Sequence, residues 1–246
     1  MKHNDYSGKQ KIDEYWKPYL SQFQSYEYKI TENITNQSTL MIQSPFINSP
    51  YDLTFEELKS FKYIETGLSR KNSFDRLINE TSIDSICSAL SFVEKNYRTD
   101  FLLHHFLANK ISDKFLDKEI WNLIIDIWSE SEFNCLSEKS RNTWQEIFTI
   151  RSRPISFIKS LPKKIDVYRG GTKDGFSWTS DIEVAKWFQN RTDLIGVDSY
   201  LLKVTVHKND VLFCRKNESE IVIDPDSLYS LWKFNDIETL EFGKTE

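Results

Sequence analysis

The hydrophobic pattern of the chain changes its period near Lys163, and this change limits the possible folds more than any other feature. Before it, apolar residues recur at helical spacing in segments 83–93, 101–110, 115–128 and 137–151. After it, short runs rich in β-branched residues predict strands at residues 165–168, 176–178, 200–207, 211–213 and 221–223. Helices followed by a sheet are the order of an α+β protein. We therefore expect a helical region at residues 1–160 and a β core at residues 161–246, with the boundary as either a seam within one domain or a division between two.

Weaker signals complete the secondary-structure prediction. An amphipathic helix is expected around residues 12–28, a polar loop at 31–38, and a short helix from the capping-box pattern at Thr54 to about Tyr63. Asp181 is a good N-cap for one helix within the β core. Its predicted core face consists of Val184, Ala185 and Phe188. The tail at residues 228–242 is expected to add one or two strands.

Composition excludes several classes of protein. With a net charge of -5, the chain as a whole lacks the excess of basic residues that is typical of nucleic-acid-binding proteins, although this does not exclude a local basic patch. No N-terminal apolar leader and no membrane-length apolar run occur. The cysteines Cys87, Cys135 and Cys214 lack metal-type spacing, and the adjacent histidines His104 and His105 would face different sides of a helix. We expect a cytoplasmic protein with reduced thiols, no metal and no membrane contact.

Two carboxylates, Glu218 and Glu220, precede the β-branched run 221–223. If the strand begins before them, both side chains point to one face. Such a pair is either solvated at a sheet edge or used by a ligand. A carboxylate beside an anomeric carbon can stabilise an oxocarbenium-like transition state, and a second one can take a proton from the attacking group.

Arg169 follows an apolar strand and precedes Gly170 and Gly171. Its planar fork suits a phosphate, and glycines let the backbone approach a ligand closely. The alternative is a surface arginine beside a turn. The hydroxyls Ser177, Thr179 and Ser180 can fix a ribose or orient a carboxylate, or they can merely begin the next helix. These residues are candidates for a binding site together with the glutamate pair.

Taken in order, segments 167–170, 175–180 and 218–220 resemble the arginine–serine–glutamate class of mono-ADP-ribosyltransferases, which includes bacterial toxins and phage enzymes. The resemblance spans residues 163–225. It implies a split core of two small sheets with NAD, the co-substrate, in the cleft between them.

The resemblance also implies roles. Arg169 would hold the NAD phosphates, and the backbone of Gly170 would meet the nicotinamide amide. Glu220 would hydrogen-bond the nicotinamide ribose and favour loss of nicotinamide, while Glu218 would activate the acceptor.

Ser177 and Thr179 would steady the cleft and the catalytic glutamate. Trp178 interrupts the family's Ser-Thr-Ser pattern, so the functional hydroxyl is either Ser177 or one of Thr179 and Ser180. Trp178 itself either packs in the core or lines the cleft.

Glu218 and the loop before it indicate which kind of molecule would accept the ADP-ribose. In the family, a glutamate at the position of Glu218 goes with arginine acceptors. Arg215 and Lys216, in the loop that would contact the acceptor, suit an acidic protein surface or a phosphate backbone. We expect transfer of ADP-ribose to a protein arginine, with RNA or DNA as the alternative acceptor, by a toxin or phage-conflict effector that an antitoxin could cover. A non-catalytic interaction module with a degenerate transferase fold is the competing interpretation.

Overall fold

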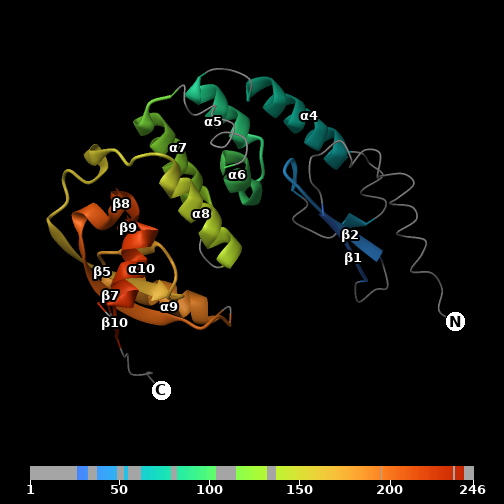
Figure 1. Cartoon of the computed structure of the whole chain (residues 1–246). Coiled ribbons are helices and arrows are strands. Elements are labelled where there is room, and N and C mark those ends of the chain that lie inside the picture. The colour runs from blue at the N-terminus through green and yellow to red at the C-terminus, as the bar shows by residue number, and fades with distance from the viewer. Residues whose placement is uncertain are drawn as a thin grey trace. The chain divides into compact units, whose positions relative to one another are not determined.

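The structure is a computed structural model, and it forms two compact units, residues 1–115 and 116–246 (Figure 1). The residues that it describes are 27–32, 38–48, 53–54, 62–78, 82–103, 115–131, 137–194, 196–234 and 236–240. Every helix in these ranges is too short or too polar to cross a membrane.

The first unit combines a small antiparallel sheet with helices. Its strands are β1 (Glu27–Glu32), β2 (Ser38–Ser44), β3 (Ile47–Asn48) and β4 (Leu53–Thr54), and β2 pairs with each of the others. Its helices are α4 (Lys62–Leu77), α5 (Ile83–Ser91) and α6 (Lys95–Phe101). Three buried rings, Phe46, Phe74 and Phe101, pack with centroids 4.9 to 6.1 Å apart and join the turn between β2 and β3 to α4 and α6.

The helix predicted at residues 83–93 is confirmed by α5, whereas the predictions for the start of this unit are wrong in part or fall outside the described residues. Tyr28, placed in a predicted helix, lies in β1, while residues 12–26 of that helix lie outside the described ranges. The predicted polar loop 31–38 overlaps the ends of β1 and β2, and its residues 33–37 are likewise not described. Thr54 is the last residue of β4, most of the helix predicted from Thr54 to about Tyr63 (residues 55–61) lies outside the described ranges, and α4 begins at Lys62. The pair His104 and His105 lies outside the described residues.

The second unit holds the remaining helices and a six-stranded sheet. Its helical elements are α7 (Asp117–Glu130), α8 (Glu138–Ile150), η4 (Ile155–Phe157), α9 (Ile182–Leu194), η5 (Lys208–Asp210), η6 (Lys216–Glu218) and α10 (Pro225–Lys233). Its strands are β5 (Lys164–Gly171), β6 (Ser177–Thr179), β7 (Tyr200–His207), β8 (Val211–Arg215), β9 (Glu220–Ile223) and β10 (Glu238–Thr239). Helices with a single antiparallel sheet are compatible with the predicted α+β class.

The strand order is β10-β7-β5-β6-β9-β8. Strands β5 and β7 pair continuously from Lys164↔His207 to Gly171↔Tyr200. Strands β5 and β6, in contrast, are joined through the single pair Tyr168↔Thr179. The pairing between the two central strands, β5 and β6, is therefore the shortest in this sheet.

An aromatic cluster ties α7 and α8 to the sheet. It consists of Trp121 and Trp128 on α7, Trp144 and Phe148 on α8, and Phe213 on β8, all nearly inaccessible to solvent. Phe213 lies 6.2 to 6.4 Å, between ring centroids, from Trp121, Trp128 and Phe148. These helices thus belong to the same compact unit as the sheet, and the units divide at 115/116 whereas the sequence pattern placed its change at 160/161.

Two details of the second unit differ from expectation. Asp224 caps α10 by accepting hydrogen bonds from the backbone of Asp226 and Ser227, with Pro225 in the first turn, and this helix occupies residues 228–233 of the tail for which strands were predicted. The tail does add one strand, β10. On α9, only Ala185 of the predicted core face is buried, and Phe188 is 44% exposed.

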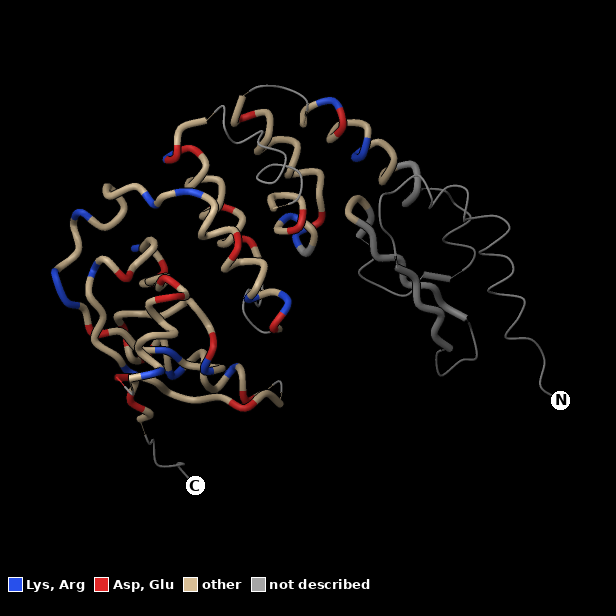
Figure 2. Tube along the Cα trace, in the orientation of Figure 1, with Lys and Arg blue, Asp and Glu red and all other residues tan. Residues whose placement is uncertain are grey.

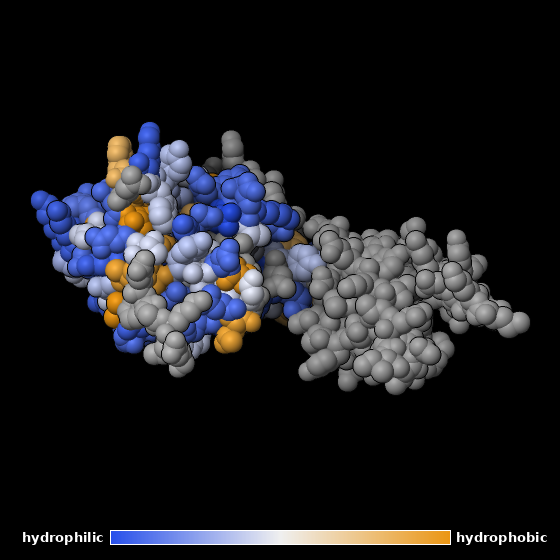
Figure 3. Space-filling view, turned by 90° about the horizontal axis from the view of Figure 1, so that it is seen from below, coloured by the Kyte–Doolittle hydropathy of each residue, from blue (hydrophilic) through white to orange (hydrophobic). Residues whose placement is uncertain are grey.

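The surface carries both signs of charge. Acidic and basic residues are interspersed along the trace of the second unit (Figure 2). The face in Figure 3 is mostly hydrophilic over its described part, with small separate apolar patches. This mixed surface matches the modest net charge of -5.

Candidate active site

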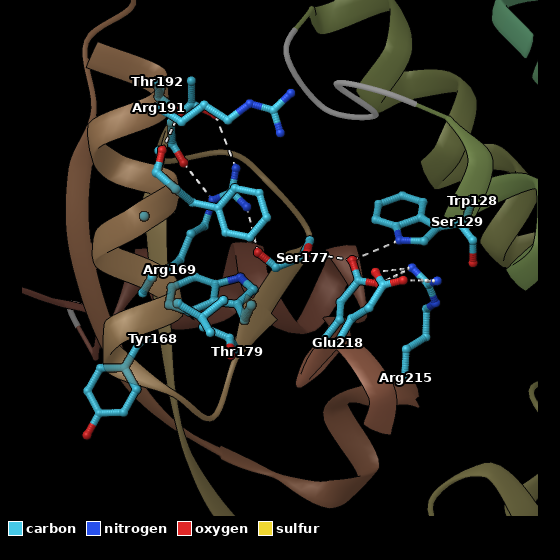
Figure 4. Close-up of a pocket in the computed structure, with 18 of the residues that line it drawn as sticks. Trp128, Ser129, Tyr168, Arg169, Ser177, Thr179, Arg191, Thr192, Arg215 and Glu218 are labelled. Atoms are coloured by element: carbon cyan, nitrogen blue, oxygen red, sulfur yellow. Dashed lines mark hydrogen bonds and ion pairs between the residues drawn. The ribbon is translucent and has the colours of Figure 1, made fainter. Parts of the chain in front are cut away.

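The carboxylate of Glu220 is the centre of a polar network in the second unit, and its partners Ser177, Trp128 and Arg215 are labelled in Figure 4. Its Oε1 accepts hydrogen bonds from Ser177 Oγ at 2.6 Å and from Trp128 Nε1 at 3.0 Å. Its Oε2 faces Arg215 Nη1 at 3.3 Å. The Glu220 side chain is 14% exposed. The donors hold the carboxylate in one orientation and compensate its charge.

Sheet register explains why these residues meet. Arg215, Glu220, Thr179 and Tyr168 are consecutive partners across β8, β9, β6 and β5. Directly opposed residues in a sheet point to the same face, as do residues two apart on one strand. Ser177 therefore shares the face of Thr179 and Glu220, which brings its hydroxyl to the carboxylate.

Glu218 reaches the network by a different route from the predicted one. The strand begins at Glu220 and not before Glu218, so strand alternation does not align the two glutamates, and that premise was wrong. Glu218 ends the short helix η6, and Ser219 turns the chain with a left-handed φ of 53°. Its carboxylate forms a two-point ion pair with Arg215, with Nη1–Oε2 at 2.6 Å. Arg215 thus bridges both glutamates.

The loop residues Arg215 and Lys216 separate in the structure. Arg215 is largely covered, with 22% of its side chain exposed, and is held by the glutamates. Lys216 is exposed on η6. Arg215 therefore contacts the predicted catalytic pair, while Lys216 faces solvent.

Arg169 lies on the other side of Ser177 from the glutamates (Figure 4). Its Nε donates to the carbonyl of Thr172 at 2.7 Å and its Nη1 to the carbonyl of Ser177 at 2.5 Å. A Cβ at Gly175 would lie only 1.7 Å from Arg169 Nη2. The absence of a side chain at Gly175 therefore makes room for the guanidinium, which fastens the β5–β6 connection beside the site.

Gly170 has a packing role that the sequence did not predict. A Cβ there would lie 1.7 Å from the carbonyl oxygen of Ala185, so only glycine allows α9 to approach β5 this closely. Gly171 follows with a φ of 126°, in the region that favours glycine. Both residues still border the cavity described below.

The three candidate hydroxyls have different partners. Ser177 contacts Glu220. Thr179 is 5% exposed, and its Oγ1 accepts from the backbone N–H of Asp181 at the start of α9. Ser180 is exposed. Of the three, Ser177 is the one with a recorded hydrogen bond to the carboxylate, and its catalytic role stays a prediction.

Trp178 lies mainly in the core, with 2% of its surface exposed. Its Nε1 donates to the carbonyl of Gly175 at 3.2 Å. The ring also borders the cavity. Trp178 therefore packs in the core, and its part in binding a ligand stays a prediction.

These side chains surround a cavity of about 370 Å³. Arg169, Arg191 and Thr192 line one end, and Arg215, Glu218 and Glu220 line the other, with Ser177 between them (Figure 4). Two glutamates against one arginine make the Glu218 end anionic, whereas Arg169 and Arg191 make the other end cationic. Such a cavity suits a ligand that carries phosphates at one end and develops positive charge at the other.

Sequence reasoning missed two kinds of lining residue. Trp128 comes from a helix 92 positions before Glu220, and nothing in its local pattern marks it as more than a core residue. Phe188 and Arg191 lie on α9, where Phe188 was assigned to the core. Their partial exposure beside the cavity becomes visible only when the helix is placed on the sheet.

The charge of Glu220 also affects a neighbouring thiol. Burial, and secondly the Glu220 carboxylate, raise the pKa of Cys214 on β8 to about 11. The Cys214 thiol is therefore protonated at neutral pH. Among the described residues no group of three or more His, Cys, Asp or Glu side chains is arranged to hold a metal ion.

Comparisons of the chain with models of protein families, with curated proteins and with solved structures found no match.

Proposed function

We propose that the chain is a mono-ADP-ribosyltransferase, which uses NAD as co-substrate and transfers ADP-ribose to a macromolecule with release of nicotinamide. The observation that carries this proposal is the hydrogen bond of 2.6 Å between Ser177 and Glu220, with Arg169 bound to the Ser177 carbonyl on the other side. Three segments that resemble the family's motifs separately thus converge at one cavity. The resemblance required this convergence, and the sequence alone did not guarantee it.

The short pairing between β5 and β6 supports the same proposal. Because β5 and β6 share one residue pair, the sheet nearly divides into β10-β7-β5 and β6-β9-β8. We propose that these halves are the two small sheets of a split transferase core. The cavity is lined by residues of both halves, among them Arg169 on β5, Ser177 on β6 and Glu220 on β9, and its volume of about 370 Å³ lies within the range of roughly 300–1,000 Å³ for small-molecule sites.

The cavity offers a physical basis for each step. NAD supplies an anomeric carbon whose bond to nicotinamide breaks with development of positive charge. Arg169 and Arg191 at the cationic end would hold the phosphates, because guanidinium groups pair with phosphate oxygens in a fork. The Glu220 carboxylate, oriented by Ser177, would stabilise the positive charge near the ribose, and Glu218 would accept the proton of the incoming acceptor.

The ion pair of Arg215 supports an arginine acceptor. Its guanidinium contacts Glu218 through two nitrogens and Glu220 through one. Glu218 therefore holds a guanidinium fork with both of its oxygens, and Glu220 lies close enough to add a third contact. An acceptor arginine would displace Arg215 or bind next to it. Transfer to RNA or DNA is the alternative outcome of the acceptor experiment below.

The first experiment measures nicotinamide release from NAD by the purified chain, alone and with a cell lysate. Glu220→Gln should lower the rate by about 10² or more, because it removes the carboxylate charge and keeps the shape. Glu238→Gln, on the exposed strand β10, is the matched control and should leave the rate unchanged. No release of nicotinamide by the wild-type chain in lysate, or an unaffected Glu220→Gln, would defeat the enzyme proposal in favour of an interaction module.

A second experiment identifies the acceptor. Lysate proteins and nucleic acids are incubated with the chain and NAD labelled in its adenylate part, then digested with protease or with nuclease. Label that resists nuclease and is lost with protease supports a protein acceptor, and mass spectrometry of the peptides should place it on arginine. Label that is lost with nuclease moves the acceptor to RNA or DNA.

A third experiment addresses the toxin hypothesis. Expression of the wild-type chain should arrest bacterial growth, and Glu220→Gln should restore it. Equal growth arrest by both forms would show that the effect does not need the carboxylate.

A further inference from the structure

The indole of Trp128 reaches the Glu220 carboxylate from helix α7. Its Nε1 donates to Glu220 Oε1 at 3.0 Å, and Ser177 Oγ donates to the same oxygen at 2.6 Å. One carboxylate oxygen therefore carries both neutral donors, while the other faces Arg215. This division fixes the plane of the carboxylate as well as its position.

Packing holds the indole rigidly. Trp128 is 2% exposed, and its ring lies 4.8 Å from the Trp144 ring, edge to face, and 5.5 Å from Phe148. A third ring, Phe213 on β8, lies 6.3 Å away. In such a close-packed cluster the ring cannot turn without displacing its neighbours. The N–H therefore points to Glu220 before any ligand binds.

The bond joins a largely buried donor to a largely covered charged acceptor. Hydrogen bonds to an ionised group are about twice as strong as neutral ones, and low solvent access strengthens them further. A core tryptophan elsewhere would satisfy its N–H with a backbone carbonyl, as Trp121 does with that of Arg151 at 3.3 Å. Trp128 instead donates its N–H to the carboxylate of Glu220, the predicted catalytic residue.

We propose that Trp128 is a positioning residue for Glu220, through which helix α7 sets the orientation of the carboxylate for the reaction. The inference rests on the proposed function for its kinetic consequence, and on the geometry alone for its structural one. Glu220 without this donor would keep Ser177 and Arg215 but rotate more freely. Loss of orientation weakens an interaction made in the transition state more than it weakens binding of the substrate.

The chain provides a matched control in Trp121. Both tryptophans lie on α7, seven residues apart, and both rings contact Phe148 and Phe213 at centroid distances of 5.5 to 6.4 Å. They differ in the acceptor of the N–H, which is Glu220 Oε1 for one and a backbone carbonyl for the other. Trp→Phe at either position removes an N–H and part of the ring from the same cluster.

The kinetic test compares Trp128→Phe with Trp121→Phe. For Trp128→Phe we expect kcat for nicotinamide release to fall about tenfold with KM for NAD changed less than about twofold. For Trp121→Phe we expect both to stay near wild type, at a similar loss of stability in urea. Equal kcat values for the two variants would overturn the proposal, because packing alone would then explain any loss.

A spectroscopic test needs no activity and no change at Trp128. In the ¹⁵N–¹H spectrum, Glu220→Gln should shift the indole N–H resonance of Trp128, because the acceptor loses its charge, and leave that of Trp121 in place. An unmoved Trp128 resonance would overturn the contact itself. If the wild-type chain released no nicotinamide, the proposed function would fail, and this resonance would still decide whether Trp128 holds Glu220.

Discussion

The two halves of the six-stranded sheet are stabilised differently. In β10-β7-β5, the long strands β5 and β7 pair over eight residues without interruption. In β6-β9-β8, β6 pairs with β9 over three residues and β8 meets β9 through an irregular register between Val211 and Phe213. Backbone pairing alone gives the second half much less support.

The second half compensates through side chains, and these include the site. Its outer strand β8 carries Phe213 into the aromatic cluster of α7 and α8. Its inner strands carry Ser177 and Glu220, which are bonded to each other and to Trp128. The first half contributes Arg169 from the end of β5. The difference teaches that the residues of the proposed chemistry lie where structure depends on helix packing, so that stability and site geometry are coupled there.

Truncation of the aromatic cluster should have the largest effect. Phe213→Ala should lower the free energy of unfolding of the second unit by about 3–5 kcal/mol, the usual cost of removing a buried phenylalanine ring. Leu202→Ala, at a fully buried position of β7, should cost about 2–5 kcal/mol. Urea unfolding measures both losses.

Near-ultraviolet circular dichroism then separates the two variants in their folded states. Phe213→Ala should weaken the tryptophan bands, because Trp121 and Trp128 lose a neighbouring ring. Leu202→Ala should preserve them. Equal weakening in both variants would contradict the idea that only one half of the sheet depends on the cluster.

Two glycines test the halves at backbone level. Gly170→Ala places a Cβ 1.7 Å from the backbone oxygen of Ala185, so α9 must move, and we expect a loss of about 1–3 kcal/mol. Gly175→Ala meets the flexible end of Arg169 instead, and we expect about 0.5–1.5 kcal/mol from the disturbed hydrogen bonds. Urea unfolding of both variants gives the comparison. A costlier Gly175→Ala would mean that the β5–β6 connection, and not the α9 contact, limits the stability of this region.

Local periodicity predicted several strands and helices of the second unit well. The alternation of apolar residues in 200–207 gave β7 with its observed bounds, and the helical spacing in 115–128 and 137–151 gave α7 and α8 within a few residues. Each of these elements buries one face, and the spacing of apolar residues in the sequence identifies that face. The α10 helix was missed although Asp224 and Pro225 form a recognisable helix start.

The site was predictable only in part. The order of Arg169, Ser177 and Glu220 pointed to one cavity, but the register that aligns Thr179 with Glu220 is a tertiary property. Trp128 was invisible because its contact spans 92 positions and its local pattern is that of any core residue. The position of Glu218 depends on the left-handed turn at Ser219, a residue type that gives no signal for such a turn.

Two hydroxyls of the second half should separate stability from activity. Ser177→Ala and Thr179→Val each remove one hydrogen bond, and each should cost about 0.5–1.5 kcal/mol in urea unfolding. Ser177→Ala should also lower kcat for nicotinamide release about tenfold, because the Glu220 carboxylate loses its closest donor. Thr179→Val should affect the start of α9 with a smaller change in kcat. A larger loss of kcat for Thr179→Val would transfer the functional role to Thr179.

The smallest expected effect uses Cys214 as a reporter of the charge on Glu220. Burial and the Glu220 carboxylate raise the pKa of this thiol to about 11, so its thiolate is scarce at neutral pH and its alkylation by iodoacetamide should speed up as pH rises toward 11. In a background with Cys87→Ser and Cys135→Ser, Glu220→Gln removes the secondary cause of the shift and leaves the burial. The pKa should then fall, and alkylation at pH 8 should accelerate by a few-fold, measured by mass spectrometry over time. An unchanged rate would mean that the charge of Glu220 does not affect the pKa of Cys214 on β8, and that burial alone raises it.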